Sequence, residues 1–332
     1  MTSALLDTFG RVATDLRVSL TDRCNLRCTY CMPAEGLARL PKPELLTDDE
    51  VLRLIEVAVT LLGITEVRFT GGEPLVRRGV VDIIRRTAQL APRPTISATT
   101  NGIGLARTAG ALRDAGLDRV NVSLDTLSET VFAELTRRDR LADVPAGLAA
   151  ASAVGLAPVK VNTVLMRGVN DHEASDILDY CLDHGFELRF IEHMPLDAQH
   201  QWSRETMVTA EEILERLSRR HTLSPELASI RGSAPAETFP VDGGPARVGV
   251  IASVTRPFCG SCDRTRLTAD GRVRNCLFAQ GETDLRGLLR AGASDEAIAQ
   301  SWVGAMWAKQ PGHGVNDVGY LQPDRPMSAI GG

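Results

Sequence analysis

The chain has 332 residues, of which 43% are hydrophobic and 24% are charged, and this composition is ordinary for a soluble globular protein with a sizeable core. The formal net charge of −5 provides no overall basic field, which argues against nucleic-acid binding and against attachment to an anionic membrane. The first residues lack the pattern of a signal peptide, and no apolar run approaches the roughly 18 residues of a membrane span, so we expect a cytoplasmic protein.

Residues 16–192 repeat one pattern, in which a short β-rich run is followed by a turn and a longer amphipathic stretch. Strands are predicted at 16–20, 66–70, 95–100, 119–124, 159–165 and 187–192. Helices are predicted at 48–63, 78–90, 106–116 and 172–185, and several of them close at a glycine. This alternation predicts right-handed βαβ units and a parallel sheet. A partial (β/α)6 TIM-like barrel and an open doubly wound sheet both fit, and we adopt the partial barrel.

The pattern changes after Pro195. One further helix is predicted at 209–220, and short runs separated by glycine and proline follow it. Asp270-Gly271 between alternating runs predicts a β-hairpin. We therefore expect one domain over residues 1–200 and a smaller, β-rich, mostly non-helical module over residues 201–332.

Six of the seven cysteines form two groups, and the first follows the first predicted strand directly. It consists of Cys24, Cys28 and Cys31, whereas Cys181 stands alone in a helical pattern and is interpreted as a small buried hydrophobe. Three thiolates on one loop suit a four-iron cluster with one iron left open to a small molecule. A zinc site would need a fourth ligand from elsewhere, and it remains the alternative.

The run CNLRCTYC (residues 24–31) resembles the signature of the radical S-adenosylmethionine superfamily, and GGEP (residues 71–74) resembles a second motif of that superfamily. The resemblance implies that the open iron holds the amino and carboxylate groups of S-adenosylmethionine, whose reductive cleavage gives a 5′-deoxyadenosyl radical. It also implies contacts to this cofactor from a set of residues near the strand ends: Tyr30, Gly72, Ser123, Asp125 and Met194.

The second group, Cys259, Cys262 and Cys276, lies in the C-terminal part. On spacing alone a zinc knuckle with a hidden fourth ligand would be the first interpretation. No further Cys or His lies close by in the sequence, however, and the intervening run is cationic, with arginines at 264, 266, 272 and 274.

The two groups together, with the terminal pair Gly331-Gly332, resemble the GTP 3′,8-cyclase family of molybdenum cofactor biosynthesis over about residues 10–332. The resemblance implies a second [4Fe–4S] cluster on the C-terminal trio, which meets the guanine ring of GTP. It implies that the radical takes hydrogen from C3′ of GTP, and that C3′ then attacks C8 to give (8S)-3′,8-cyclo-7,8-dihydroguanosine 5′-triphosphate. The product would pass to cyclic pyranopterin monophosphate synthase.

Cations on separate strands offer what a triphosphate needs in a net acidic chain. By strand alternation Arg17, Arg68 and Lys160 could point into one lumen, although for any one of them alone a surface salt bridge would be the first interpretation. The resemblance implies GTP contacts from these three and from Thr99, Arg264, Thr265 and Arg266, with Arg189 as a further candidate. It also implies that Arg17, Gly331 and Gly332 serve catalysis, because in this family the GG end enters the active site.

Two rival interpretations remain at this stage. One is a radical S-adenosylmethionine peptide maturase with an auxiliary cluster, and the other is a non-catalytic zinc-binding module. The sequence does not name an electron donor, and it is compatible with a monomer or a homodimer.

Overall fold

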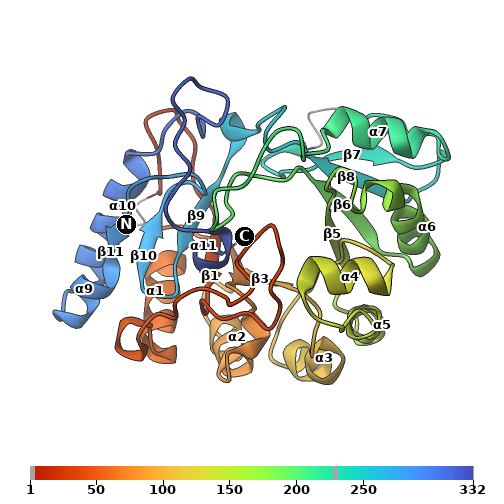
Figure 1. Cartoon of the computed structure of the whole chain (residues 1–332). Coiled ribbons are helices and arrows are strands. Elements are labelled where there is room, and N and C mark those ends of the chain that lie inside the picture. The colour runs from red at the N-terminus through yellow and green to blue at the C-terminus, as the bar shows by residue number, and fades with distance from the viewer. Residues whose placement is uncertain (1–3, 227–230, 332) are drawn as a thin grey trace.

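Six parallel strands form the middle of the sheet in the computed structural model, which describes residues 4–226 and 231–331. These strands are β1 (Asp15–Ser19), β2 (Glu66–Thr70), β3 (Thr95–Thr100), β4 (Arg119–Ser123), β5 (Lys160–Val164) and β6 (Glu187–Ile191). They are neighbours in chain order, β1 to β6, and they match the six predicted strands to within a residue or two at each end. The described sheet is curved but not closed, as the partial-barrel prediction requires (Figure 1).

Helices connect these strands and pack beside one another around the outside of the sheet (Figure 1). They are α1 (Asp48–Thr60), α2 (Val80–Ala88), α3 (Leu105–Asp114), α4 (Glu129–Thr136), α5 (Asp143–Ala153) and α6 (Ala174–His184), with 3₁₀ turns η1 (Lys42–Glu44), η2 (Pro74–Val76) and η3 (Asp171–Glu173). Thr47 and Glu50 cap the start of α1 reciprocally, and Gly185 ends α6 in the left-handed conformation that glycine adopts without strain. The predicted helices are confirmed, whereas α4 and α5 were not among them.

The C-terminal part extends the same sheet at both ends. β9 (Arg264–Leu267) pairs in parallel with β1, and β8 (Arg247–Ile251) pairs in parallel with β6. The remaining additions are antiparallel: β7 (Glu237–Pro240) on β8, β10 (Arg272–Arg274) on β9, and β11 (Thr283–Asp284) on β10. The predicted hairpin turns at Gly271, whose φ is +75°. The sheet order is therefore β11-β10-β9-β1-β2-β3-β4-β5-β6-β8-β7.

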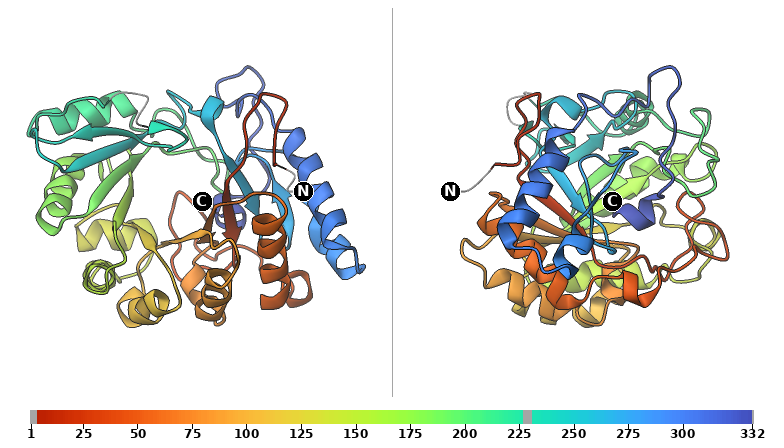
Figure 2. Two further views of the ribbon diagram at one scale, coloured as in Figure 1. Left: turned by 180° about the vertical axis from the view of Figure 1, so that it is seen from behind. Right: turned by 90° about the vertical axis from the view of Figure 1, so that its left-hand side faces the viewer.

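Helices of the C-terminal part lie at both ends of this sheet and at its centre. They are α7 (Ala210–Ser218), α9 (Leu285–Arg290), α10 (Asp295–Trp307) and α11 (Met327–Ile330), with the turn η4 (Cys259–Ser261). α10 packs on β10 and β11, and its buried Trp302 reaches β9, where it donates its indole N–H to Thr265 Oγ1 at 2.9 Å. α11 lies near the middle of the molecule in both views of Figure 2.

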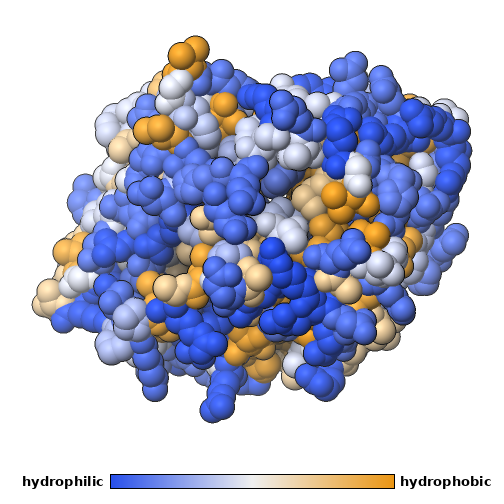
Figure 3. All heavy atoms as spheres, viewed as in Figure 1, coloured by the Kyte–Doolittle hydropathy of each residue, from blue (hydrophilic) through white to orange (hydrophobic). Residues whose placement is uncertain are grey.

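The main core lies between the sheet and its helices and includes the side chain of Cys181, which is fully buried as predicted. Among the described residues no helix is long and apolar enough to cross a membrane. Figure 3 shows a mostly hydrophilic face, with hydrophobic residues gathered beside a hollow to the right of its centre. The carboxyl ends of the parallel strands are the edge at which such folds place their functional groups.

Candidate active site

The first cysteine trio lies on the loop that follows β1. The backbone N–H groups of Cys31 and Met32 both donate to the Cys28 carbonyl at 3.0 Å, which closes the loop into a tight turn. Two neutral donors reach the Cys24 sulfur, namely the Leu26 N–H at 3.4 Å and the Asn101 side-chain amide at 3.7 Å. Hydrogen bonds of this kind are typical of sulfurs that carry thiolate charge in iron–sulfur proteins.

Burial raises the pKa of all three thiols in this loop, to about 11 for Cys31. Repulsion from Cys31 raises the pKa of Cys28 further, and Cys24 acts in the same way on Cys31. Three crowded thiols therefore disfavour the thiolate state unless a positive centre compensates them. Metal coordination supplies that positive charge and deprotonates the ligating thiols. Among the described residues no group of three or more Cys, His, Asp or Glu side chains is arranged to hold a single metal ion, so the chemistry of this trio suits a cluster of several metals and not one ion.

A cavity of about 160 Å³ adjoins the first trio. Its wall includes Gly71 and Gly72 from the turn after β2, and a Cβ on Gly72 would collide with the Arg23 carbonyl oxygen. The buried Glu73 fixes this turn, because its carboxylate accepts the Thr100 hydroxyl at 2.8 Å and the Asn101 N–H at 2.7 Å. The glycine pair thus lets the backbone pack directly against the cysteine loop, which leaves a small space next to the sulfurs.

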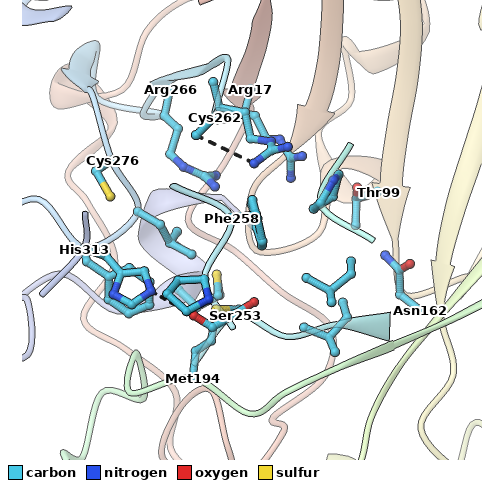
Figure 4. A pocket seen from close by; sticks show the side chains of 18 of the residues that line it. Arg17, Thr99, Asn162, Met194, Ser253, Phe258, Cys262, Arg266, Cys276 and His313 are labelled. Atoms are coloured by element: carbon cyan, nitrogen blue, oxygen red, sulfur yellow. Dashed lines mark hydrogen bonds between the residues drawn. The ribbon is translucent and has the colours of Figure 1, made fainter. Parts of the chain in front are cut away.

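The second trio lines a larger cavity of about 290 Å³. Cys259 is the first residue of η4, Cys262 follows its last residue, and Cys276 follows β10. Burial would raise the pKa of Cys262, but Lys309 and Arg264 outweigh burial and lower it. Figure 4 shows Cys262 and Cys276 on the same side of this cavity as Arg17 and Arg266. Burial, together with repulsion from Cys276, raises the pKa of Cys259, so Cys262 is the thiol of this trio whose surroundings favour the thiolate.

The two cavities meet at a shared wall formed by Tyr30, Thr99, Ser123, Asp125 and Met327. Tyr30 donates its hydroxyl to Asp125 Oδ2 at 2.5 Å, and Asp125 Oδ1 accepts the Val164 N–H at 2.8 Å. Burial raises the pKa of Asp125 to about 6. A molecule in the larger cavity would therefore lie between the two cysteine trios.

Arginines from neighbouring strands form a row beneath the larger cavity. The strand register places Arg17 opposite Arg68 on one side and opposite Arg266 on the other. Burial lowers the pKa of Arg68 and of Arg266 to about 9, and repulsion from the other guanidinium groups adds to this effect. Asp15 faces the row from below, with Oδ2 3.5 Å from Nη2 of Arg17 and 3.9 Å from Nη2 of Arg68. Buried cations in excess of their carboxylate partner form a site for a multiply charged anion.

The structure brings most of the predicted site residues to these two cavities. Their walls include all six cysteines of the two trios, together with Arg17, Tyr30, Arg68, Gly72, Thr99, Ser123, Asp125, Arg189, Met194, Arg264 and Arg266. Gly331 is buried beside them, since its carbonyl oxygen accepts a hydrogen bond from Arg266 and a Cβ there would collide with Thr70 Oγ1. Gly332 lies outside the described residues.

Two predicted GTP contacts do not line either cavity. Lys160 forms an ion pair with Glu187 at 3.1 Å. Thr265 alternates with its two arginine neighbours along β9, so its hydroxyl lies on the opposite face of the sheet, under Trp302. The structure thus does not bring these two side chains to the cavity walls, and their contacts to a ligand stay predictions.

Sequence reasoning missed several residues of the site. Asp15 lies two residues before Arg17 on the same strand, and this spacing could have indicated that both side chains share one face. Phe258 and His313 line the larger cavity, and Lys309 contacts Cys262, but these residues lie on irregular segments that carry no periodic signal.

Comparison with known families divides the chain in two. Residues 18–181 match the Radical SAM superfamily, and residues 186–315 match Molybdenum Cofactor Synthesis C.

Curated relatives resemble the chain along its whole length. A protein of Streptomyces coelicolor named GTP 3′,8-cyclase is 69% identical over 99% of this chain and 96% of its own. A Mycobacterium tuberculosis protein named GTP 3′,8-cyclase 2 is 60% identical over 100% of this chain and 93% of its own.

Solved structures share the fold at much lower identity. The crystal structure of Streptococcus suis SuiB has a TM-score of 0.58 and 13% identity, with 92% of this chain and 68% of that chain covered. A second structure, of SuiB bound to S-adenosylmethionine, has a TM-score of 0.57 and 13% identity, with 87% of this chain and 68% of that chain covered.

Proposed function

The chain belongs to the GTP 3′,8-cyclase family of radical S-adenosylmethionine enzymes, and we propose that it catalyses the first step of molybdenum cofactor biosynthesis. In this step GTP becomes (8S)-3′,8-cyclo-7,8-dihydroguanosine 5′-triphosphate. The observation that carries the proposal is the pair of cysteine trios, which line adjoining cavities above a row of buried arginines.

The enzyme uses two [4Fe–4S] clusters and S-adenosylmethionine. We propose that Cys24, Cys28 and Cys31 hold one cluster and that the second trio, Cys259, Cys262 and Cys276, holds the other. When bound, the first cluster and S-adenosylmethionine supply the 5′-deoxyadenosyl radical that removes hydrogen from C3′ of GTP. The donor set supports this assignment, because each trio leaves one iron of a four-iron cluster open for a small molecule.

The smaller cavity is the proposed S-adenosylmethionine site. Gly72 lines this cavity and packs closely against the Arg23 carbonyl, and its backbone is proposed to meet the amino group of the cofactor. Tyr30 and Ser123 stand at the boundary with the larger cavity, and Met194 lines the larger cavity. In this assignment Tyr30 orients Asp125 through its hydroxyl, and both residues lie between the cofactor site and the larger cavity.

The larger cavity is the proposed GTP site. Arg17, Arg68 and Arg266 would receive the triphosphate, because a buried polyanion relieves the mutual repulsion of their guanidinium groups. Arg264 and Thr99 line the same space, whereas Lys160 and Thr265 would need to act through movement or through backbone atoms. The position between both trios suits a substrate whose guanine and ribose meet different centres.

The C-terminal glycines are the proposed closing element of the site. The Gly331 carbonyl accepts from Arg266, so the chain end can set the direction of this guanidinium group. A residue with a side chain would not fit against Thr70 and Ser19 at this position. Gly331 and Gly332 are therefore proposed, with Arg17, to serve catalysis.

The product would be taken up by cyclic pyranopterin monophosphate synthase, and the enzyme would act as a monomer or homodimer. Oxidisable clusters and six reduced ligand thiols suit the reducing conditions of the cytoplasm, where we propose the reaction takes place.

Anaerobic reconstitution tests the proposal. The chain should bind about eight irons, and with GTP, S-adenosylmethionine and a one-electron reductant it should form 5′-deoxyadenosine and the cyclised nucleotide. A variant with Cys24, Cys28 and Cys31 changed to Ala should retain about four irons and form neither product. One or two zincs per chain, or the absence of both products from the fully loaded enzyme, would overturn the proposal.

A further inference from the structure

Lys309 is a buried cation near the second trio that the proposed reaction does not use. It follows α10 and is only 3% exposed. Its ammonium group donates to the Arg264 carbonyl at 3.0 Å, to the Cys262 carbonyl at 3.2 Å and to the Cys262 sulfur at 3.4 Å. Within residues 4–226 and 231–331, no carboxylate lies within the 4.0 Å of an ion pair with it.

A buried ammonium group without a carboxylate partner is costly, because two carbonyl dipoles do not replace its hydration shell. The Cys262 sulfur is the third acceptor of this ammonium group and the one that can carry a full negative charge. A Cys262 thiolate in a cluster would therefore complete the electrostatic environment of Lys309. The geometry thus indicates a pair of opposite charges, in which the ammonium group of Lys309 donates to the thiolate sulfur of Cys262.

The two trios differ in the donors that reach their sulfurs. Cys24 accepts from a backbone N–H and from the Asn101 amide, and both donors are neutral. Cys262 accepts from Lys309 and, at 3.7 Å, from Arg264, and both of these donors are charged. Reduction adds negative charge to a cluster, so nearby positive charge and hydrogen bonds to its sulfurs favour the reduced state.

We propose that Lys309 is a potential-setting residue for the second cluster. It acts through the Cys262 sulfur to make this centre easier to reduce than the centre on Cys24, Cys28 and Cys31. The inference rests on the proposed function in one respect, since it requires that the second trio holds a cluster. Lys309 does not line the GTP cavity, so its effect on substrate is indirect.

Redox titration of the second cluster alone tests this proposal. The full chain with Cys24, Cys28 and Cys31 changed to Ala leaves one centre, which is titrated anaerobically with a one-electron reductant and followed by electron paramagnetic resonance. In that background we expect Lys309→Met to lower the reduced-to-oxidised ratio at a fixed potential at least tenfold, which is about 59 mV for a one-electron couple. Lys309→Arg keeps the charge and should remain close to the parent, and Lys42→Met removes an exposed lysine as the matched control.

Iron content separates failure of this inference from failure of the proposed function. A parent variant without about four irons would refute the second cluster itself. A parent and a Lys309→Met variant with equal iron and equal potential would overturn only the role of Lys309. If Lys309→Met loses iron, Lys309→Gln is titrated instead, because glutamine keeps a hydrogen-bond donor but carries no charge. A lower reduction potential of the second cluster in Lys309→Gln than in the parent supports the proposal. Loss of iron from the Met, Gln and Arg variants alike would assign Lys309 to packing and would overturn the proposal.

Discussion

Asp15→Asn should destabilise the substrate-free protein, because it removes the carboxylate that faces the buried arginine row. Asp15 Oδ2 lies 3.5 Å from Arg17 Nη2 and 3.9 Å from both Arg68 Nη2 and Arg264 Nε. Loss of one partner of a buried ion pair costs roughly 3–5 kcal/mol, and these contacts are long, so we expect about 3 kcal/mol in the free energy of unfolding. Urea denaturation of the substrate-free variant measures this loss.

The same substitution should tighten GTP binding. A bound triphosphate supplies the negative charge that Asp15 otherwise provides, so the complex loses less stability than the free protein does. If half of the loss is recovered, about 1.4 kcal/mol, the thermodynamic cycle requires an affinity about tenfold higher. Equilibrium GTP binding to the anaerobically reconstituted enzyme measures this change.

Glu66→Gln is the matched control for Asp15→Asn. Glu66 lies opposite Asp15 in the strand register, and its side chain is 43% exposed where it pairs with Arg119. Loss of such a partly exposed pair should cost less than about 1 kcal/mol. The charge argument fails if Asp15→Asn is no more destabilising than Glu66→Gln, or if Asp15→Asn weakens GTP binding.

Three further predictions concern other parts of the site. Gly331→Ala should reduce turnover at least tenfold at unchanged iron content, because its methyl group would collide with Thr70 and its φ is +86°; unchanged turnover would contradict this account of the tail. Asp125→Asn should become more stable relative to the parent as pH rises. In the parent the folded pKa of Asp125, about 6, lies above its ordinary value of 3.8, so the folded protein resists ionisation of this carboxyl group. The parent therefore loses stability from about pH 4 upward, and the loss levels off once the pH has passed the folded pKa of about 6. The gain between pH 5 and pH 7.5 in urea denaturation of the cluster-free protein should be about 1 kcal/mol, and a gain that shrinks over this range would contradict the sign. Thr265→Val should cost about 1–2 kcal/mol through the lost Trp302 hydrogen bond and leave GTP affinity unchanged, so a tenfold weaker affinity would show that Thr265 meets the nucleotide.

The parallel strands could be predicted from sequence because each one combines a local β-rich run with a turn and an amphipathic helix. Both the repeat over residues 16–192 and the hairpin at Gly271 follow from such local signals. The place of β9 beside β1 could not be predicted in this way. Their pairing joins Asp15 to Arg264 across most of the chain, and no short-range pattern encodes it.

The position of both cysteine trios at the two cavities could be predicted from spacing, whereas most of the electrostatic environment of the site could not. The position of Arg17 and Arg68 at the cavity could be predicted, because both lie on predicted strands whose side chains alternate between the two faces of the sheet. Side chains alternate between the two faces of β9, and Arg264 and Arg266 line the cavity. Alternation therefore puts Thr265, which lies between them, on the face of the sheet that points away from the cavity. Lys309 reaches Cys262 only through the path of the chain after α10, so tertiary structure alone reveals it.

The pairing of β1 with β9 also constrains how the protein can be made. The last residue of β1 is Ser19 and the first of β9 is Arg264, so at synthesis rates of about 5–20 residues per second the partner strand follows roughly 12–50 s later. During that interval one edge of β1 has no partner, and an open strand edge promotes aggregation. A chain cut near residue 200 would keep this edge exposed permanently. The first cysteine loop, which directly follows β1, can therefore be expected to fold correctly only in a chain that reaches β9.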